Sequence, residues 1–480
     1  MLREVTIMIR LSKTQITKLL LVMAILFAVN FSLPISKILS AQTSQQTCIQ
    51  GAEIPAGFDF PANQNTLMQL IAKQDWPALR RHAWMVFAGL SQPAREGGDC
   101  LVWETWYDKA QTYTLNPSAT RSKLSQRITK PRQLDSARML DNLGLKPGQS
   151  PKELKHPNGQ AILASVIYNK VAYDYIRDNK LYLLSTLAGM QGSIKEFPRP
   201  AVVVKPTWWP VAKSGYTPLP VWDNDPANPL LQYNGYETWK RLVAIDPTPS
   251  STEKTVSVTF PNNNKDYPAK TSDANVVSLN RFYYYKLTAE DIAGIGPDDA
   301  IAKSATEVLN RSLQEGDYIA FLGMHYATKE ITNWVWATFW WHDQANTDNP
   351  NKSVARYAED RPAAIKGVWL NYLMDTSYDM VNPKESNGSA AVCINPYDEL
   401  QINMPGTILT NCTTCHVRAA YPSFINTETN GSADTKKRSN VAIYDTLRRG
   451  YIPSNDPIFR NLVKVDTLWS ISDNAIPDKQ

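Results

Sequence analysis

Apolar residues recur at helical spacing in three stretches of the chain. Over residues 63–90 this spacing predicts two short helices, because Pro77 breaks the run and suits the first turn of the second helix. Residues 162–178 carry apolar side chains along one side of a predicted amphipathic helix, and a further helix is predicted over 297–313. Since the first two stretches lie early in the chain, we expect residues 42–195 to form a mainly helical N-terminal region.

Short β-branched or aromatic runs between Pro, Gly and Asn residues dominate the next segment, residues 196–345. Such runs are typical of strands, so this segment is expected to be a largely antiparallel β-domain and the fold class is α+β. Two runs, 317–329 and 333–341, predict a hairpin, with Lys329 and Glu330 as solvated charges at its turn. The other predicted strands lie within 199–211, 216–223, 255–260 and 281–287. Residues 346–480 are expected to be rich in loops and short helices.

The first forty residues have the layout of an export signal. Basic residues precede the uncharged apolar run LLLVMAILFAVNF, and small residues follow before Gln42. This pattern predicts a signal peptide over residues 1–41, cleaved after Ala41, and a periplasmic protein. Leu39 is large for its place before the cut, so an uncleaved membrane anchor stays open as the alternative.

Composition and charge are those of an ordinary globular protein. Charged residues make up 20% of the 480 residues, and the net charge of +5 is spread along the chain. Because no Lys/Arg cluster is interleaved with aromatic residues on one element, we expect no nucleic-acid partner. After the export signal no hydrophobic stretch is long enough to span a bilayer, so membrane contact is expected only if the signal is retained.

The strongest chemical signal is the sequence CTTCH, residues 412–416. Two cysteines two residues apart with a histidine next to them occur in zinc sites, dithiol redox pairs and c-type haem sites. Zinc needs a fourth ligand, from Cys393 or a remote histidine, and a redox dithiol opens a helix after a strand of a βαβ unit, which LQINMPGTILTN does not resemble. A c-type haem uses all three residues: Cys412 and Cys415 form thioethers, and His416 is the proximal iron ligand. Covalent haem attachment also agrees with export.

Three of the five cysteines lie outside this motif. In an oxidising compartment Cys48 and Cys100 are the expected disulfide, which leaves Cys393 outside it.

With its export signal and late CTTCH motif, the chain resembles c-type cytochromes. The stretches VVVKPTWWPV, FLGMHYATKEITNWVWATFWW, NCTTCHVRAA and VKVDTLWSI resemble a group of large exported monohaem proteins known as cytochrome c family proteins. This resemblance implies one covalently attached haem c and no particular substrate. A looser likeness, in the aromatic strand before the late motif, is to small monohaem cytochromes that oxidise hydroxylamine or bind nitric oxide.

No Met, His or Cys follows His416, so a sixth iron ligand has to come from upstream or the iron is open on that side. His325 is the first candidate for the distal pocket, because strand alternation places it on one face with Gly323 and Ala327. A hydrogen-bonded sheet histidine is the alternative for this residue. Met404, eight residues before the motif, is the alternative distal ligand. The tryptophans of 333–341 are expected to pack in the core, or to rest against a haem edge.

These observations together predict a periplasmic monohaem cytochrome that transfers single electrons to or from a redox partner protein or a small molecule. The alternative is a haem enzyme with an open iron position that acts on a small oxidant or a nitrogen species. No catalytic residue is assigned.

Overall fold

Two helices, α3 (Gln64–Lys73) and α4 (Trp76–Leu90), open the described part of the chain, as the apolar spacing predicts. Asn63 and Asp75 cap them by accepting hydrogen bonds from backbone N–H groups of the first turn. Pro77 lies in the first turn of α4, where its missing N–H costs no hydrogen bond. Both predicted helices and the place of the proline are confirmed.

The computed structural model describes residues 50–95, 100–117, 162–223, 236, 239–248, 254–261, 268–297, 299–346, 357–379, 393, 395–398, 411–422 and 455–479. All of these belong to one compact unit, Ile49–Gln480. Within these ranges no helix combines the length and the apolar character needed to cross a bilayer. Predictions on other residues remain predictions; they concern the signal peptide, Cys48 and Met404.

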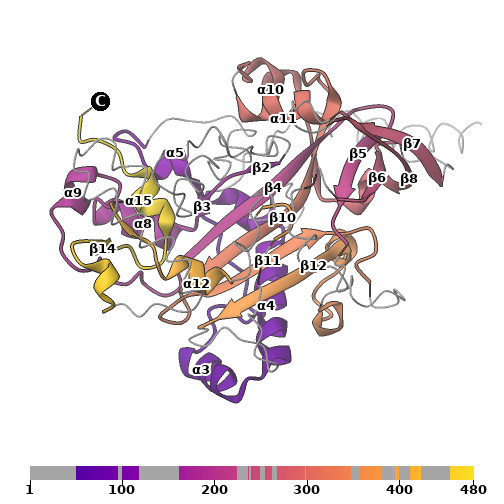
Figure 1. Ribbon diagram of the computed structural model, residues 1–480. Coiled ribbons are helices and arrows are strands. Elements are labelled where there is room, and N and C mark those ends of the chain that lie inside the picture. The colour runs from indigo at the N-terminus through magenta and orange to yellow at the C-terminus, as the bar shows by residue number, and fades with distance from the viewer. Residues whose placement is uncertain are drawn as a thin grey trace, which may run out of the picture. The chain divides into compact units, whose positions relative to one another are not determined.

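The largest element is an eight-stranded antiparallel sheet (Figure 1). Its order is β1-β3-β4-β10-β11-β12, with β2 also paired to β4 and β9 to β10. The sheet confirms the α+β class and the predicted hairpin, which is formed by β10 and β11. The strands are β1 (Tyr107–Asp108), β2 (Leu163–Ala164), β3 (Ile167–Tyr168), β4 (Val202–Val211), β9 (Tyr284–Lys286), β10 (Tyr318–Thr328), β11 (Val335–Trp341) and β12 (Tyr372–Tyr378).

A second sheet has four strands in the order β5-β6-β8-β7. Its β6–β8 pairing is parallel, and its other two pairings are antiparallel. The strands are β5 (Thr217–Val221), β6 (Arg241–Asp246), β7 (Thr255–Phe260) and β8 (Lys270–Ser278). The sequence pattern finds β5 and β7 but misses β6 and β8.

Shorter elements complete the described fold. The predicted helix before Gly316 is α11 (Ala300–Leu309). The other α-helices are α5 (Lys109–Thr112), α8 (Lys170–Asp178), α9 (Leu184–Ala188), α10 (Ala289–Ala293), α12 (Cys412–His416) and α15 (Trp469–Asn474). Two short strands, β13 (Ala420–Tyr421) and β14 (Val463–Lys464), pair with each other. The 3-10 helices are η1 (Val102–Thr105), η5 (Leu279–Arg281), η6 (Ala358–Asp360), η7 (Gly367–Asn371) and η10 (Pro457–Phe459).

The prediction of one helix over residues 162–178 is wrong in its first half. Residues 163–164 and 167–168 form β2 and β3, which pair with β4, and only α8 is helical. Asn169 separates the two parts, because its side-chain oxygen accepts from the N–H groups of Ala172 and Val202 at once. One oxygen thus starts the helix and ties the preceding residues to the sheet.

The two faces of the large sheet have different neighbours. On the face that we call the α4 face, the Phe87 ring of α4 stacks on Phe339 at a centroid distance of 4.0 Å. On the same face, the hydroxyl of Tyr326 on β10 donates to the carbonyl of Ala83 at 2.8 Å. Since strand side chains alternate, the opposite face carries His325, Trp336, Thr338 and Ser377, and we call it the α12 face.

Tight contact within the sheet requires a glycine at one position. Gly323 lies at the β-bulge where the register of β10 against β4 shifts. A Cβ atom there would clash with the carbonyl oxygen of Phe339 on β11. The absence of a side chain therefore allows β10 to keep its pairing with both neighbours.

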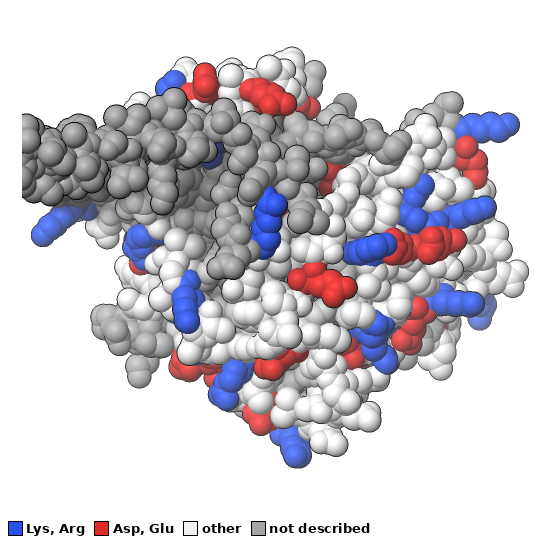
Figure 2. All heavy atoms as spheres, turned by 180° about the vertical axis from the view of Figure 1, so that it is seen from behind, with Lys and Arg blue, Asp and Glu red and all other residues white. Residues whose placement is uncertain are grey.

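Basic and acidic side chains of the described residues lie interspersed on the face of the molecule shown in Figure 2. Such mixing agrees with the even spread of charge along the sequence.

Candidate functional site

The CTTCH motif forms the short helix α12, which packs against β11 and β12 on the α12 face (Figure 1). Ser377 of β12 holds the helix in place. Its hydroxyl oxygen lies 2.6 Å from that of Thr413 and 3.1 Å from the side-chain oxygen of Asn411. All three residues are buried, so these hydrogen bonds are shielded from water and anchor the motif to a strand.

Helical spacing brings Cys412 and His416 one turn apart on one side of α12. The side chain of Cys415 lies outside the described atoms. The motif thus presents one thiol and one imidazole in the same direction, from a helix that the sheet fixes.

His416 is oriented by two neighbours. Its Nδ1 donates to the carbonyl oxygen of Thr467 at 2.8 Å, and its ring lies against Trp336 at a centroid distance of 4.0 Å and an interplanar angle of 34°. Burial lowers the pKa of His416 to about 4, opposed by the Thr467 hydrogen bond and helped by the charges of His325 and Lys205. The imidazole is therefore neutral, with its proton on Nδ1.

The other ring nitrogen of His416, Nε2, has no hydrogen-bond partner among the described residues. A neutral imidazole with Nδ1 bound to a backbone carbonyl and a lone pair on Nε2 is the usual form of a metal-ligating histidine. The tautomer, the orientation and the adjacent aromatic ring all fit an axial haem ligand. One of the tryptophans of 333–341, Trp336, thus does lie at the motif.

The carbonyl that accepts from His416 belongs to a tightly fixed loop. Asp466 and Thr467 both adopt positive φ, 46° and 67°. Asp466 is held by the N–H of Phe197 at 2.8 Å and by the Lys329 ammonium group at 2.7 Å. Because the side chain of Lys329 is fully buried, this ion pair is shielded from water and fixes the backbone next to His416.

The expectation that Lys329 and Glu330 are solvated charges at the hairpin turn is wrong. Lys329 is 0% and Glu330 1% exposed. The Glu330 carboxylate accepts from the N–H of Ala62 at 2.6 Å and lies 3.3 Å from Nε2 of His82. Burial opposes the charge of His82, but Glu330 and the Asp59 carbonyl raise its pKa above the ordinary value. Each of the two charged side chains, Lys329 and Glu330, pairs with a group from a segment distant in sequence. This pairing lowers the free-energy cost of burying the charge.

His325 lies on the α12 face, as strand alternation predicts, and pairs across the strands with Lys205 and Thr338. Its Nε2 is 2.8 Å from Oδ2 of Asp398, and the Lys205 ammonium group lies 2.6 Å from the same oxygen. Burial would raise the pKa of Asp398, but Lys205 and His325 hold it well below its usual range. His325 is thus part of a polar triad with Asp398 and Lys205, whose members also influence His416 electrostatically.

The sequence links Cys393 to the motif only as a candidate fourth zinc ligand, whereas the structure places its sulfur next to that of Cys412. Cys393 is 4% exposed, and its Sγ lies 3.4 Å from Sγ of Cys412. Both cysteines are thiols. Cys100 is disulfide-bonded, and since Cys393 and Cys412 are thiols, neither is its partner. Cys48 lies outside the described residues, so its pairing with Cys100 remains a prediction.

The described atoms of Cys412 and His416 suit a haem site and also suit a zinc site. Within the described residues no group of three or more His, Cys, Asp or Glu side chains could hold a metal ion. The proximity of Cys393 to Cys412 is what a zinc site would need. The hydrogen bond of His416 to Thr467 and its contact with Trp336 are what an axial haem ligand would need.

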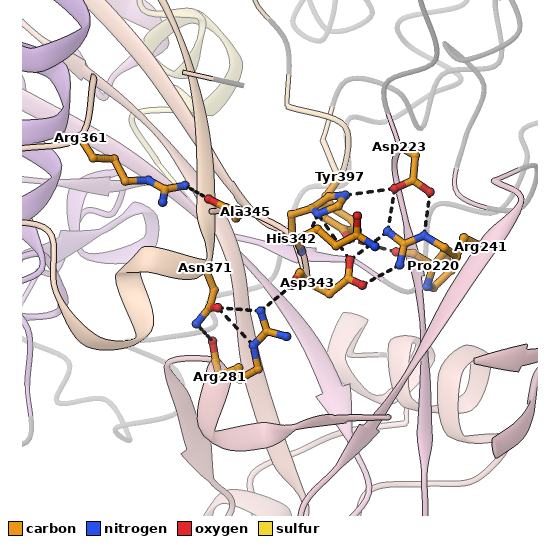
Figure 3. A network of polar contacts seen from close by, with 11 residues as sticks. Pro220, Asp223, Arg241, Arg281, His342, Asp343, Ala345, Arg361, Asn371 and Tyr397 are labelled. Atoms are coloured by element: carbon orange, nitrogen blue, oxygen red, sulfur yellow. Dashed lines mark hydrogen bonds and ion pairs between the residues drawn. The ribbon is translucent and has the colours of Figure 1, made fainter. Parts of the chain in front are cut away.

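Another histidine belongs to a polar network between the two sheets (Figure 3). Arg241 forms ion pairs with Asp223 at 2.6 Å and with Asp343 at 2.7 Å. His342 is buried, with Nε2 3.2 Å from Asp223 and Nδ1 accepting from the N–H of Gln344. Burial opposes ionisation of Asp223, but the hydrogen bonds from Arg241 and His342 hold its pKa well below the usual range. Arg241 supplies the positive charge that faces both carboxylates, and the hydrogen bonds of His342 account for it as a structural residue.

Comparisons of the chain with profiles of protein families, with curated proteins and with solved structures gave no match.

Proposed function

We propose that this protein is an exported, periplasmic c-type cytochrome that carries one haem on α12. Cys412 and Cys415 would hold the haem through thioether bonds, and Nε2 of His416 would be its proximal iron ligand. The observation that carries the proposal is the 2.8 Å hydrogen bond from Nδ1 of His416 to Thr467, which leaves Nε2 as the ligating nitrogen. The haem would supply a one-electron change at its iron.

Electron transfer is the activity that this arrangement supports best. The motif rests on strands through the buried Ser377 hydroxyl, and the His416 imidazole is held between Trp336 and Thr467. Side chains locked in this way keep an axial ligand in one orientation in both oxidation states. The partner would be a redox protein or a small-molecule electron donor or acceptor, and an uncleaved signal would place the protein at the membrane.

A second candidate function is a haem enzyme with an open iron position, acting on a small oxidant or a nitrogen species. The observation in its favour is the triad of His325, Asp398 and Lys205 on the α12 face. A histidine oriented by a carboxylate can hold or deliver a proton, which an electron carrier does not need. His325 would be the acid or base of such an enzyme, and no residue is assigned to contact the substrate.

The test of covalent haem attachment uses the exported protein purified from a host that attaches haem. We expect the haem to remain on the polypeptide through acid–acetone extraction, and the intact mass to exceed that of the processed chain by one haem. In Cys412→Ser/Cys415→Ser the haem should be lost on extraction. His416→Ala is the matched variant, since it keeps both thiols and should retain the haem with an altered spectrum. Extractable haem in the wild type, or bound zinc in its place, would overturn the proposal.

A further inference from the structure

The sulfur atoms of Cys393 and Cys412 are held close together by buried polar contacts. Their Sγ–Sγ distance is 3.4 Å, against about 2.05 Å in a disulfide, so a small movement would join them. The segment of Cys393 is fixed to β11, because the Asn395 amide donates to Thr338 and to the carbonyl of Phe339 at 3.0 and 3.1 Å. Thr413, the residue next to Cys412, is hydrogen-bonded to Ser377 of β12.

The two thiols differ in exposure in a way that suits stepwise disulfide exchange. Cys412 is half-buried, whereas Cys393 is 4% exposed. An external disulfide can therefore reach Cys412 first. Cys393, which is buried, can then attack Sγ of Cys412 from the protein interior. Nineteen positions separate the two residues in sequence, so the pair is distinct from the C-x-x-C spacing of the motif itself.

We propose that Cys393 is the disulfide partner of Cys412 in the haem-free chain, and that this disulfide blocks haem attachment until a dithiol opens it. The blocking role rests on the proposed function, because it presumes that Cys412 receives a haem vinyl group. The disulfide itself does not depend on haem. It would make attachment conditional on the supply of reductant outside the cytoplasm.

The chemistry needs a disulfide donor and, later, a dithiol. The Cys412 thiolate attacks one sulfur of the donor, which releases one donor thiolate and leaves a mixed disulfide. The Cys393 thiolate then attacks Sγ of Cys412 and releases the second donor thiolate, so two protein thiols are oxidised and one disulfide is reduced. Opening is the reverse exchange with an external dithiol, which is oxidised to its disulfide. Only the opened form has a Cys412 thiol that can add to a vinyl group.

The decisive measurement is made on the wild-type chain, exported in a host without haem-attachment machinery. The protein is blocked with iodoacetamide, digested without reductant and mapped by mass spectrometry. We expect a linked peptide pair containing Cys393 and Cys412, which disappears after dithiothreitol. An alkylated Cys393, or zinc bound to unoxidised thiols, would overturn the inference. Neither result depends on whether the chain can bind haem.

Haem loading then tests the blocking role. In a haem-attaching host grown with added cystine, we expect at least twofold higher haem occupancy in Cys393→Ser than in the wild type. Ser377→Ala is the matched control, because it disturbs the docking of α12 without removing a thiol, and its occupancy should not rise. Equal occupancy in Cys393→Ser and the wild type would refute the blocking role. If haem attaches and the linked peptide is absent, only this inference fails; if the linked peptide forms and haem never attaches, the proposed function and the blocking role fail together.

Discussion

Nδ1 of His416 donates a hydrogen bond to the carbonyl oxygen of Thr467 at 2.8 Å. The bond determines which ring nitrogen is left to bind a metal, and it couples the imidazole to a loop that comes fifty-one positions later in the chain. That loop is positioned by the buried ion pair of Lys329 and Asp466. The electronic character of His416 therefore depends on two charged residues that do not touch it.

Replacing the buried lysine tests this dependence. Lys329→Met leaves the Asp466 carboxylate without its cation, and we expect a loss of about 3–5 kcal/mol in the free energy of unfolding of the haem-free protein. Lys170→Met is the control, because Lys170 pairs with Asp174 on the surface and its removal should cause no measurable change. Urea denaturation of the three proteins provides the comparison.

In the haem protein the same substitution has a second expected effect. A looser Thr467 carbonyl weakens the hydrogen bond to Nδ1, which makes the imidazole a poorer electron donor and should raise the reduction potential. A redox titration measures this shift. A potential that stays at the wild-type value in Lys329→Met, despite the loss of stability, would contradict the coupling.

The buried pair of His82 and Glu330 predicts a dependence of stability on pH. The folded state raises the pKa of His82 above its ordinary value of 6.5. The stabilisation is therefore complete below about pH 6.5 and is lost as the pH rises through the higher folded pKa. We expect the difference in unfolding free energy between the wild type and His82→Gln to shrink from pH 6 towards pH 9, approximately. A difference that is constant, or that grows with pH, would show that His82 is not charged in the fold.

The disulfide of Cys100 gives a covalent prediction. Gly51 and Ala52, just after Cys48, are hydrogen-bonded to Thr105, five residues beyond Cys100. We expect Cys48 to be its partner, closing a loop of about fifty residues that contributes roughly 4 kcal/mol at most. Non-reducing peptide mapping identifies the partner directly. A link from Cys100 to Cys415 would refute both this pairing and the haem attachment at that thiol.

Local patterns were enough for the parts of the fold that depend on neighbouring residues. Pro77 and the apolar spacing around it define α3 and α4, and the aromatic alternation around Gly323 and Trp336 defines the hairpin. The prediction of a helix over 162–178 fails in its first half, because the apolar spacing there does not distinguish a helix from two short strands. The choice was made by Asn169 and by pairing with β4, which no local pattern contains.

The neighbours of the motif could not be predicted for a related reason. The spacing of Cys412, Cys415 and His416 is a local signal, but the groups that orient them lie far away in sequence. Lys329 and Asp466 are 137 positions apart, and Lys205 and Asp398 are 193 apart. From the sequence alone, a charged residue that follows a strand is expected to be exposed to solvent. Only the fold reveals that its partner is buried with it.

The sequence ranks His325 first for the distal pocket, and in the fold this residue lies on the α12 face. Its Nε2, however, lies 2.8 Å from Asp398, whose other partner is the Lys205 ammonium group. To bind iron through Nε2, His325 would have to leave a buried carboxylate, which is costly. We therefore expect His325 to act through a proton and not as an iron ligand.

The spin state of the ferric haem and the rate of cyanide binding show whether His325 is an iron ligand or a base. In His325→Ala the ferric haem should keep its wild-type spin state, because no iron bond is lost. If the iron has an open position, cyanide should bind about a hundredfold more slowly in that variant, since the base that takes the proton of hydrogen cyanide is gone. Asp398→Asn should slow binding less, because the histidine remains but is oriented poorly. A change from low to high spin in His325→Ala would instead identify His325 as the sixth ligand. The same change in Met404→Ala would assign that place to Met404 and favour the electron carrier over the enzyme.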